Sequence, residues 1–163
     1  MRIFHCDHCG HLLFFENTRC LQCDTLVAYL PDLGIVGSLD QNEDDTWRSP
    51  LPAAEGRLYR LCNNYQHQHV CNWALAAGDL TLCQSCELTR TIPNLSKEGA
   101  TQSWYRLEVA KRRLLYTLFG LGIFPESGDA GPALLFDFKS DEPGSHVLTG
   151  YASGVITINV VES

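Results

Sequence analysis

The sequence lacks any apolar run long enough to cross a membrane, and no apolar segment follows its first two residues, Met1 and Arg2. A membrane-spanning helix needs about 20 apolar residues, and a secretory signal needs an apolar segment close to the N-terminus. We therefore expect neither membrane association nor export. This absence predicts a cytoplasmic protein.

Basic residues are also few. The 163 residues include 12 lysine and arginine residues against 19 aspartate and glutamate residues, which gives a formal net charge of −7. Nonspecific nucleic-acid binding depends on neutralising phosphate groups with Lys and Arg. The charge balance therefore makes nucleic acid an unlikely partner. A net negative charge still permits a local basic patch on the surface.

Cysteine, by contrast, is abundant and regularly spaced. Of the eight cysteines, six form C-x2-C pairs, and the first two pairs are Cys6 with Cys9 and Cys20 with Cys23. Each pair can occupy a tight turn that presents two thiolates, and two such turns make the tetrahedral cage that Zn²⁺ prefers. Without an export signal, this pattern favours zinc over the alternatives, disulfides or incidental buried cysteines. Residues 1–30 are therefore predicted to be a zinc ribbon, with a strand at 10–16 and a closing strand at 26–30.

A second constellation is less regular. Cys83 and Cys86 form the third C-x2-C pair, whereas Cys62 and Cys71 stand nine positions apart with His67 and His69 between them. Four cysteines are the favoured ligand set, and three cysteines with one of the two histidines are the alternative. Either set fills all four positions of a structural zinc site and leaves none open for a catalytic water. We therefore predict two structural Zn²⁺ ions, held by Cys6, Cys9, Cys20 and Cys23 and by Cys62, Cys71, Cys83 and Cys86.

The stretch between these constellations offers little periodicity. Pro31 and Gly34 interrupt regular structure, and the segment 40–45 carries four acidic residues. It lacks the Gly and terminal Glu of a calcium loop, so a solvated turn is favoured over a cation site. Residues 31–56 are predicted to be an irregular connection, and 57–95 a second zinc-binding module.

The spacing of apolar residues changes after this module. A three-to-four spacing predicts a helix over 101–121, capped by Ser96 or Thr101 and ended by Gly120, Gly122 and Pro125. The basic cluster 111–113 is predicted to lie on a solvated flank of this helix, with phosphate binding as the alternative. The apolar positions are Trp104, Leu107, Ala110, Leu114, Leu118 and Leu121.

Three strands are predicted after the helix, at 133–139, 146–151 and 155–161, and the last two are close enough to form a hairpin. The third strand is apolar on both faces and is expected to leave an open edge, which favours self-association through it. The predicted fold class is thus α+β. A zinc-ribbon region with two structural zinc sites is followed, over 96–163, by a helix packed on a small antiparallel or mixed sheet.

Five phrases of the sequence resemble one family, the bacterial zinc-binding metallopeptidases that carry an N-terminal zinc-ribbon region. They lie at 12–23, 71–73, 90–96, 110–118, and 148–151 together with 154–159. The resemblance implies a partial zincin-like domain after the ribbon. In that family an H-E-x-x-H helix follows the last phrase, and its two histidines bind zinc while its glutamate activates the metal-bound water.

These 163 residues end before that helix and contain no H-E-x-x-H. No catalytic residue of the family is therefore carried over, and the chain is predicted to be inactive alone. We expect the zinc-binding N-terminal region of a zinc metallopeptidase, which binds a protein or peptide partner. A zinc-ribbon adaptor for nucleic acid or a transcription-type protein is the alternative, and redox chemistry of the C-x2-C thiols is a third interpretation.

Overall fold

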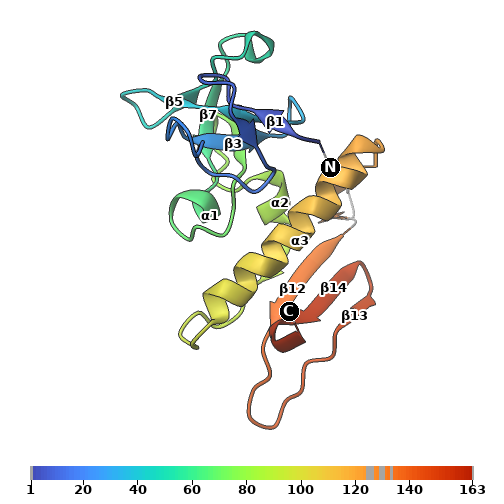
Figure 1. Ribbon diagram of the computed structural model, residues 1–163. Coiled ribbons are helices and arrows are strands. Elements are labelled where there is room, and N and C mark those ends of the chain that lie inside the picture. The colour runs from blue at the N-terminus through green and yellow to red at the C-terminus, as the bar shows by residue number, and fades with distance from the viewer. Residues whose placement is uncertain (1, 124–126, 129–130, 133, 163) are drawn as a thin grey trace. The chain divides into compact units, whose positions relative to one another are not determined.

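The computed structural model describes residues 2–123, 127–128, 131–132 and 134–162. The chain forms two compact units, Met1–Cys83 and Gln84–Ser163 (Figure 1). Both contain short helices and small sheets, which confirms the α+β class. Within the described ranges, no helix is long and apolar enough to cross a membrane.

The first unit begins with two antiparallel hairpins. Strands β1 (Phe4–His5) and β2 (Leu12–Leu13) form the ribbon hairpin, and β3 (Val27–Leu30) pairs with β4 (Ile35–Ser38). The sequence predicted that residues 26–30 close the ribbon sheet, and this prediction is wrong. The chain turns after Leu30 and returns as β4, so β3 pairs with β4 and not with the ribbon hairpin. Gly34 makes that turn with a φ of 67°, and its N–H donates to the Leu30 carbonyl.

Residues 31–56 are not irregular. Besides β4 they contain β5 (Asp40–Gln41), β6 (Trp47–Arg48) and the short helix η1 (Pro52–Ala54). The acidic segment forms a hairpin turn, closed where the Asn42 N–H donates to the Thr46 carbonyl and the Thr46 N–H donates to Asp44. Strands β5 and β6 continue into β7 (Leu58–Leu61) and β8 (Ala74–Ala76), in the antiparallel order β5-β6-β7-β8.

An aromatic and polar core joins these parts of the first unit. The Tyr29 ring lies 5.2 Å from Phe15 and 4.7 Å from Trp73, measured between ring centroids. The Tyr65 hydroxyl, on α1 (Asn63–Gln66), donates to the carbonyls of Thr18 and Val27. Tyr65, which lies between Cys62 and Cys71 in the sequence, therefore holds the backbone of the ribbon directly.

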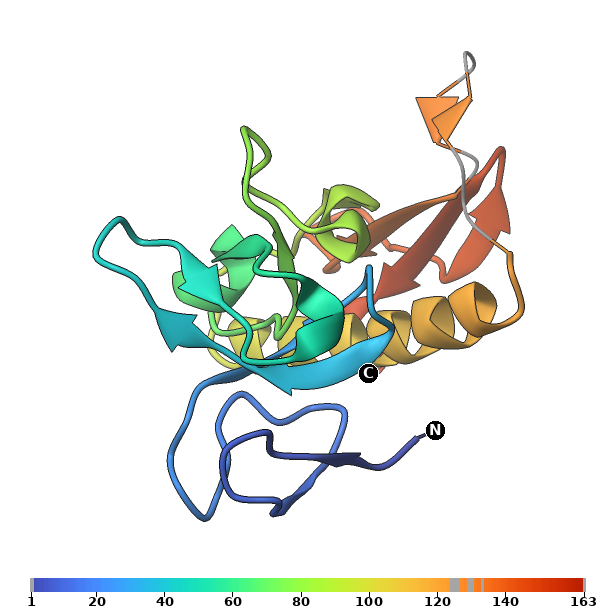
Figure 2. The same ribbon diagram turned by 90° about the horizontal axis from the view of Figure 1, so that it is seen from above.

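The second unit is a four-stranded mixed sheet beside a long helix (Figure 2). It starts with α2 (Gln84–Glu87) and continues through a sheet in the order β13-β14-β12-β9, where β12 runs parallel to both β14 and β9. A short hairpin of β10 (Ser127–Gly128) and β11 (Gly131–Pro132) precedes β12. The other elements are β9 (Thr89–Thr91), α3 (Ala100–Gly120), β12 (Leu135–Lys139), β13 (Gly150–Ala152), β14 (Val155–Asn159) and η2 (Val160–Glu162).

The last strand differs from its prediction. It ends at Asn159, and both of its edges are paired, with β12 on one side and β13 on the other. The expected open edge is therefore absent from β14, and the edge strands of this sheet are β13 and β9. Of the strand predicted at 146–151, only its end enters β13, because Asp141 accepts the Val147 N–H at 2.8 Å and holds that segment as a loop.

Helix α3 lies within one residue of its predicted bounds, but its cap is different. Gly99 is the N-cap residue, in the left-handed region with a φ of 75°, and no side chain caps the helix. The Ser96 hydroxyl and N–H both donate to Asn94 instead. The expected cap at Ser96 or Thr101 is therefore wrong. Pro125 and Ala133, expected at the helix end and a strand start, lie outside the described residues.

The basic cluster of α3 does not lie on a solvated flank. The side chains of Lys111 and Arg112 are buried, at 3% and 1% exposure, and only Arg113 is exposed. The Lys111 ammonium forms an ion pair of 2.8 Å with Glu108, one helical turn earlier. It also donates to the Thr89 hydroxyl and lies 5.6 and 5.7 Å from the ring centroids of Phe136 and Phe138, respectively. A charge is tolerated here because an opposite charge and aromatic faces surround it.

A second charged contact fixes the pairing of β9 with β12. Arg90 on β9 donates two hydrogen bonds, of 2.9 and 2.6 Å, to the buried carboxylate of Asp137 on β12. The Arg90 guanidinium holds the pKa of this carboxyl well below its usual range. Such bidentate pairs are directional, so this contact ties the two strands together near their register shift.

Candidate metal centres

The first cysteine group is built by two turns with the same backbone hydrogen bonds. The Cys6 N–H donates to the His11 carbonyl, and the Gly10 N–H donates back to the Cys6 carbonyl. Fourteen positions later the pattern repeats, with Cys20 in place of Cys6, Asp24 in place of Gly10 and Thr25 in place of His11. Gly10 and Asp24 share a left-handed backbone, with φ values of 72° and 58°.

These turns bring the sulfur atoms of Cys6, Cys9, Cys20 and Cys23 within 4.8 Å of one another. The Sγ–Sγ distances are 3.6 Å for Cys6 and Cys23 and 3.5 Å for Cys9 and Cys20. A tetrahedron with Zn–S bonds of about 2.3 Å has edges of about 3.8 Å, whereas a disulfide measures about 2.05 Å. The geometry therefore suits a four-thiolate zinc site.

The second group has the same geometry in a more buried setting. Its sulfur atoms also lie within 4.8 Å of one another, and Cys71 and Cys83 are 3.7 Å apart. The Trp73 N–H donates to the Cys71 sulfur and the Cys83 N–H to the Cys62 sulfur, both at 3.4 Å. Backbone donors to sulfur stabilise the thiolate form that zinc binds. The members are Cys62, Cys71, Cys83 and Cys86, all buried.

The two histidines proposed as alternative ligands lie on the surface. His67 and His69 are both exposed, and His69 has a left-handed backbone with a φ of 55°. Four sulfur atoms already form the compact group beside them. The arrangement thus favours the four-cysteine set, and ligation of zinc by these cysteines remains a prediction.

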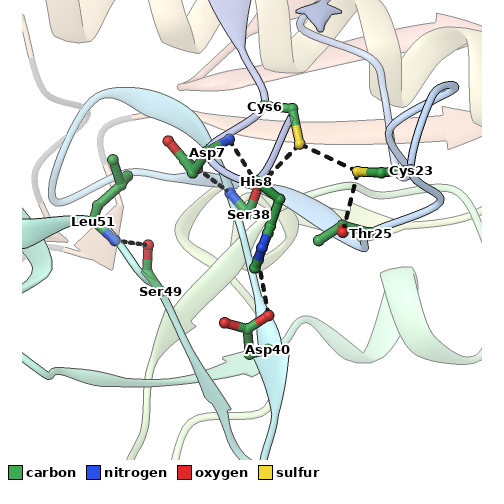
Figure 3. A network of polar contacts seen from close by, with 9 residues as sticks. All are labelled: Cys6, Asp7, His8, Cys23, Thr25, Ser38, Asp40, Ser49 and Leu51. Carbon is green, nitrogen blue, oxygen red and sulfur yellow. Dashed lines mark hydrogen bonds and ion pairs between the residues drawn. The ribbon is translucent and has the colours of Figure 1, made fainter. Parts of the chain in front are cut away.

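Strand β4 and the residues after it anchor the first turn (Figure 3). The Ser38 hydroxyl accepts the Asp7 N–H at 3.2 Å and lies 3.6 Å from the Cys6 sulfur, while the Asp7 carboxylate accepts the Ser38 N–H at 2.7 Å. His8 and Asp40 form a further contact of 3.0 Å between Nε2 and Oδ1. Sequence reasoning missed Ser38 because it lies 32 positions from Cys6 and belongs to no spacing motif.

Two of the thiols in this group have a lowered pKa, whereas the pKa of Cys9 is raised to about 12, because its hydrogen bond with the His11 backbone, which lowers the pKa, is outweighed by burial and the neighbouring thiols. Hydrogen bonding between Cys23 and both the hydroxyl and the backbone of Thr25 lowers the pKa of Cys23 to about 6. At Cys6, burial raises the pKa, but hydrogen bonds from Ser38 and from the backbone outweigh it, so that the pKa is lowered. Both effects favour thiolates, the form in which cysteine binds zinc.

Replacing Ser38 with alanine should therefore weaken zinc binding at the first group. The Cys6 thiolate would lose a hydrogen-bond partner and the Asp7 N–H an acceptor, and such changes beside a metal site typically cost about 10–100-fold in affinity. Competition with a chromophoric chelator measures the loss. Ser49→Ala is the matched control. This serine is also buried, and its hydroxyl accepts a hydrogen bond from the Leu51 N–H, which is not part of either cysteine group. An equal loss in both variants would contradict a role specific to Ser38.

Comparison with known families assigns the two parts of the chain separately. A family model described as a zinc-ribbon domain matches residues 3–97. A second, described as "Putative zinc-binding metallo-peptidase", matches residues 100–163. The resemblance expected from the sequence is thus confirmed.

Similar proteins occur in mycobacteria. An uncharacterized protein of Mycobacterium bovis and two of Mycobacterium tuberculosis strains are each 33% identical to this chain over 165 residues. The match covers 99% of this chain and 44% of each relative, so the chain spans less than half the length of the curated relatives it matches. No solved structure matches significantly.

Proposed function

Because the chain belongs to the zinc-ribbon domain family over residues 3–97, and residues 100–163 match a metallopeptidase family, we propose that it is the structural zinc-binding region of a longer, metallopeptidase-like protein. In this proposal each cysteine group holds one Zn²⁺ ion, and the region binds a protein or peptide partner in the cytoplasm. The observation that carries it is the pair of four-sulfur groups with tetrahedral dimensions.

The cysteines of each group would hold their ion as thiolates and join segments that are distant in sequence. Cys6 and Cys9 would fix the ribbon hairpin to the Cys20–Cys23 turn, and Cys62 would fix the start of α1 to the segment around Cys83. A bound zinc ion supplies a crosslink that contributes folding free energy, on the order of 10 kcal/mol or more. Four thiolates fill the coordination sphere, so this arrangement supports a structural role and not hydrolysis.

A role in partner binding is supported by apolar side chains on the surface of the first unit. Ile3, Phe14 and Leu21 are exposed to 62%, 57% and 81% of their maximum, respectively, and all three belong to the ribbon. Large exposed apolar side chains on a small domain are common at protein interaction sites. Eight free thiols suit a reducing compartment, which supports the proposed location in the cytoplasm.

We expect zinc and protein in a ratio of two to one when the chain is purified without added metal. The reason is that the sulfur atoms of each group lie as close together as the ligands of a zinc site, and that most of these cysteines are buried. Elemental analysis by inductively coupled plasma mass spectrometry gives the ratio directly. A ratio near one, with four thiols open to alkylation in the native chain, would contradict one of the two sites.

A further inference from the structure

The two cysteine groups differ in how far they are open to solvent. Cys6 and Cys20 are buried, whereas Cys9 and Cys23 are exposed, so two of the four residues in the first group are accessible to solvent. In the second group no cysteine has more than 2% of its surface exposed. The chain therefore contains two four-cysteine groups, of which the first is accessible to solvent and the second is not.

We propose that the first group is a site of oxidation, at which a hydroperoxide converts zinc-binding thiolates into a disulfide and zinc is released, while the second group keeps its ion. This inference rests on the proposed zinc binding and adds to it a chemical difference between the sites. Thiolate character and exposure together decide which cysteines are oxidised. Cys9 and Cys23 combine the two, because zinc ligation would keep them as thiolates and both residues are exposed.

The positions of the sulfur atoms determine which pair should form. Exposed Cys9 lies 3.5 Å from buried Cys20, and exposed Cys23 lies 3.6 Å from buried Cys6. Each exposed cysteine thus has a buried partner on the other turn of the ribbon. The expected disulfides, Cys9–Cys20 and Cys6–Cys23, join the two turns.

The reaction balances with the peroxide as the oxidant. The exposed thiolate attacks one peroxide oxygen, the O–O bond breaks, a sulfenic acid forms, and the leaving hydroxide takes a proton from solvent. The buried thiolate then attacks the sulfenic sulfur, the S–O bond breaks, the disulfide forms, and a second hydroxide takes a second proton. Two thiolates lose two electrons, hydrogen peroxide gains them, and two water molecules result. Only two thiolates then remain at the first group, too few to retain the ion.

The test uses the full zinc-loaded chain, with the second group as an internal control. Hydrogen peroxide is added, released zinc is followed with a chromophoric chelator, and disulfides are mapped by mass spectrometry after alkylation. We expect one zinc ion per chain to be released at least about tenfold faster than the other, because buried thiolates react slowly. Dimedone, which traps sulfenic acids, should label Cys9 or Cys23 first, and dithiothreitol with added zinc should restore the original ratio.

Three results would overturn the inference: release of both ions at one rate, a first disulfide among Cys62, Cys71, Cys83 and Cys86, or retention of both ions at peroxide concentrations that oxidise a free cysteine peptide. The zinc ratio before peroxide is added tests the proposed function separately. A chain that starts with two ions and then gives any of these three results refutes the oxidation site alone. A chain that starts without zinc at the first group refutes both.

Discussion

Replacing Cys20 with serine is expected to remove one of two zinc ions and to unfold the ribbon. The ribbon strands β1 and β2 are only two residues long, so their stability depends on the metal crosslink, worth about 10 kcal/mol. The loss should extend to β3 and β4, because Ser38 on β4 is bonded to the Cys6–Cys9 turn. Hydrogen exchange followed by mass spectrometry would show lost protection across residues 4–38.

The second unit should keep its protection in this variant. Helix α3 is held within its own unit, for example by the hydrogen bonds that Glu108 accepts from Thr89 and Trp104. Cys62→Ser is the reciprocal variant and should lose the other ion. His11→Ala is the matched control, because this exposed ribbon residue lies beside the first group without belonging to it. Equal loss of protection in both units after Cys20→Ser would contradict this independence.

Replacing Glu108 with alanine should produce the largest loss of stability in the second unit. Glu108 is fully buried, pairs with Lys111 at 2.8 Å, and accepts hydrogen bonds from Trp104 Nε1 and the Thr89 hydroxyl. The substitution leaves the Lys111 charge buried without its counter-charge, which typically costs about 3–5 kcal/mol. Denaturant unfolding followed by hydrogen exchange within α3 measures the change.

A double variant separates the cost of the unpaired charge from that of lost packing. Glu108→Leu with Lys111→Met removes both charges and should be less destabilising than Glu108→Ala, because apolar residues often replace a buried ion pair at little cost. Exposed Glu98 is the matched control, and Glu98→Ala should change the unfolding free energy by less than about 0.5 kcal/mol. A double variant as unstable as the single one would show that the charge pair itself is not the cause.

Local patterns in the sequence predicted the parts of the structure that depend on local chemistry. The C-x2-C pairs identified the first sulfur group and the Cys83–Cys86 half of the second, because two residues between cysteines suit a turn that presents both thiols to one side. The apolar spacing placed helix α3 within one residue at each end. Both signals arise from neighbouring residues, so neither required knowledge of the tertiary fold.

The features that were missed depend on partners far away in sequence. Strands β5 and β6 have two residues each, too few for any periodic pattern, and they form because β6 pairs with β5 on one side and with β7 on the other. Lys111 seemed to belong at the surface because its charge alone favours water. Its burial depends on Phe136 and Phe138, about 25 positions later in the chain, and on Glu108 at the same helix face.

X-ray absorption at the zinc K edge tests the central claim most directly, because it reports the ligand atoms of the bound metal. With two four-cysteine sites we expect a single shell of four sulfur atoms at about 2.3 Å, without a nitrogen or oxygen contribution. A histidine ligand such as His67 or His69, or a bound water, would add a scatterer at about 2.0–2.1 Å and lower the sulfur count. A first shell with nitrogen or oxygen in it would contradict two closed four-thiolate sites.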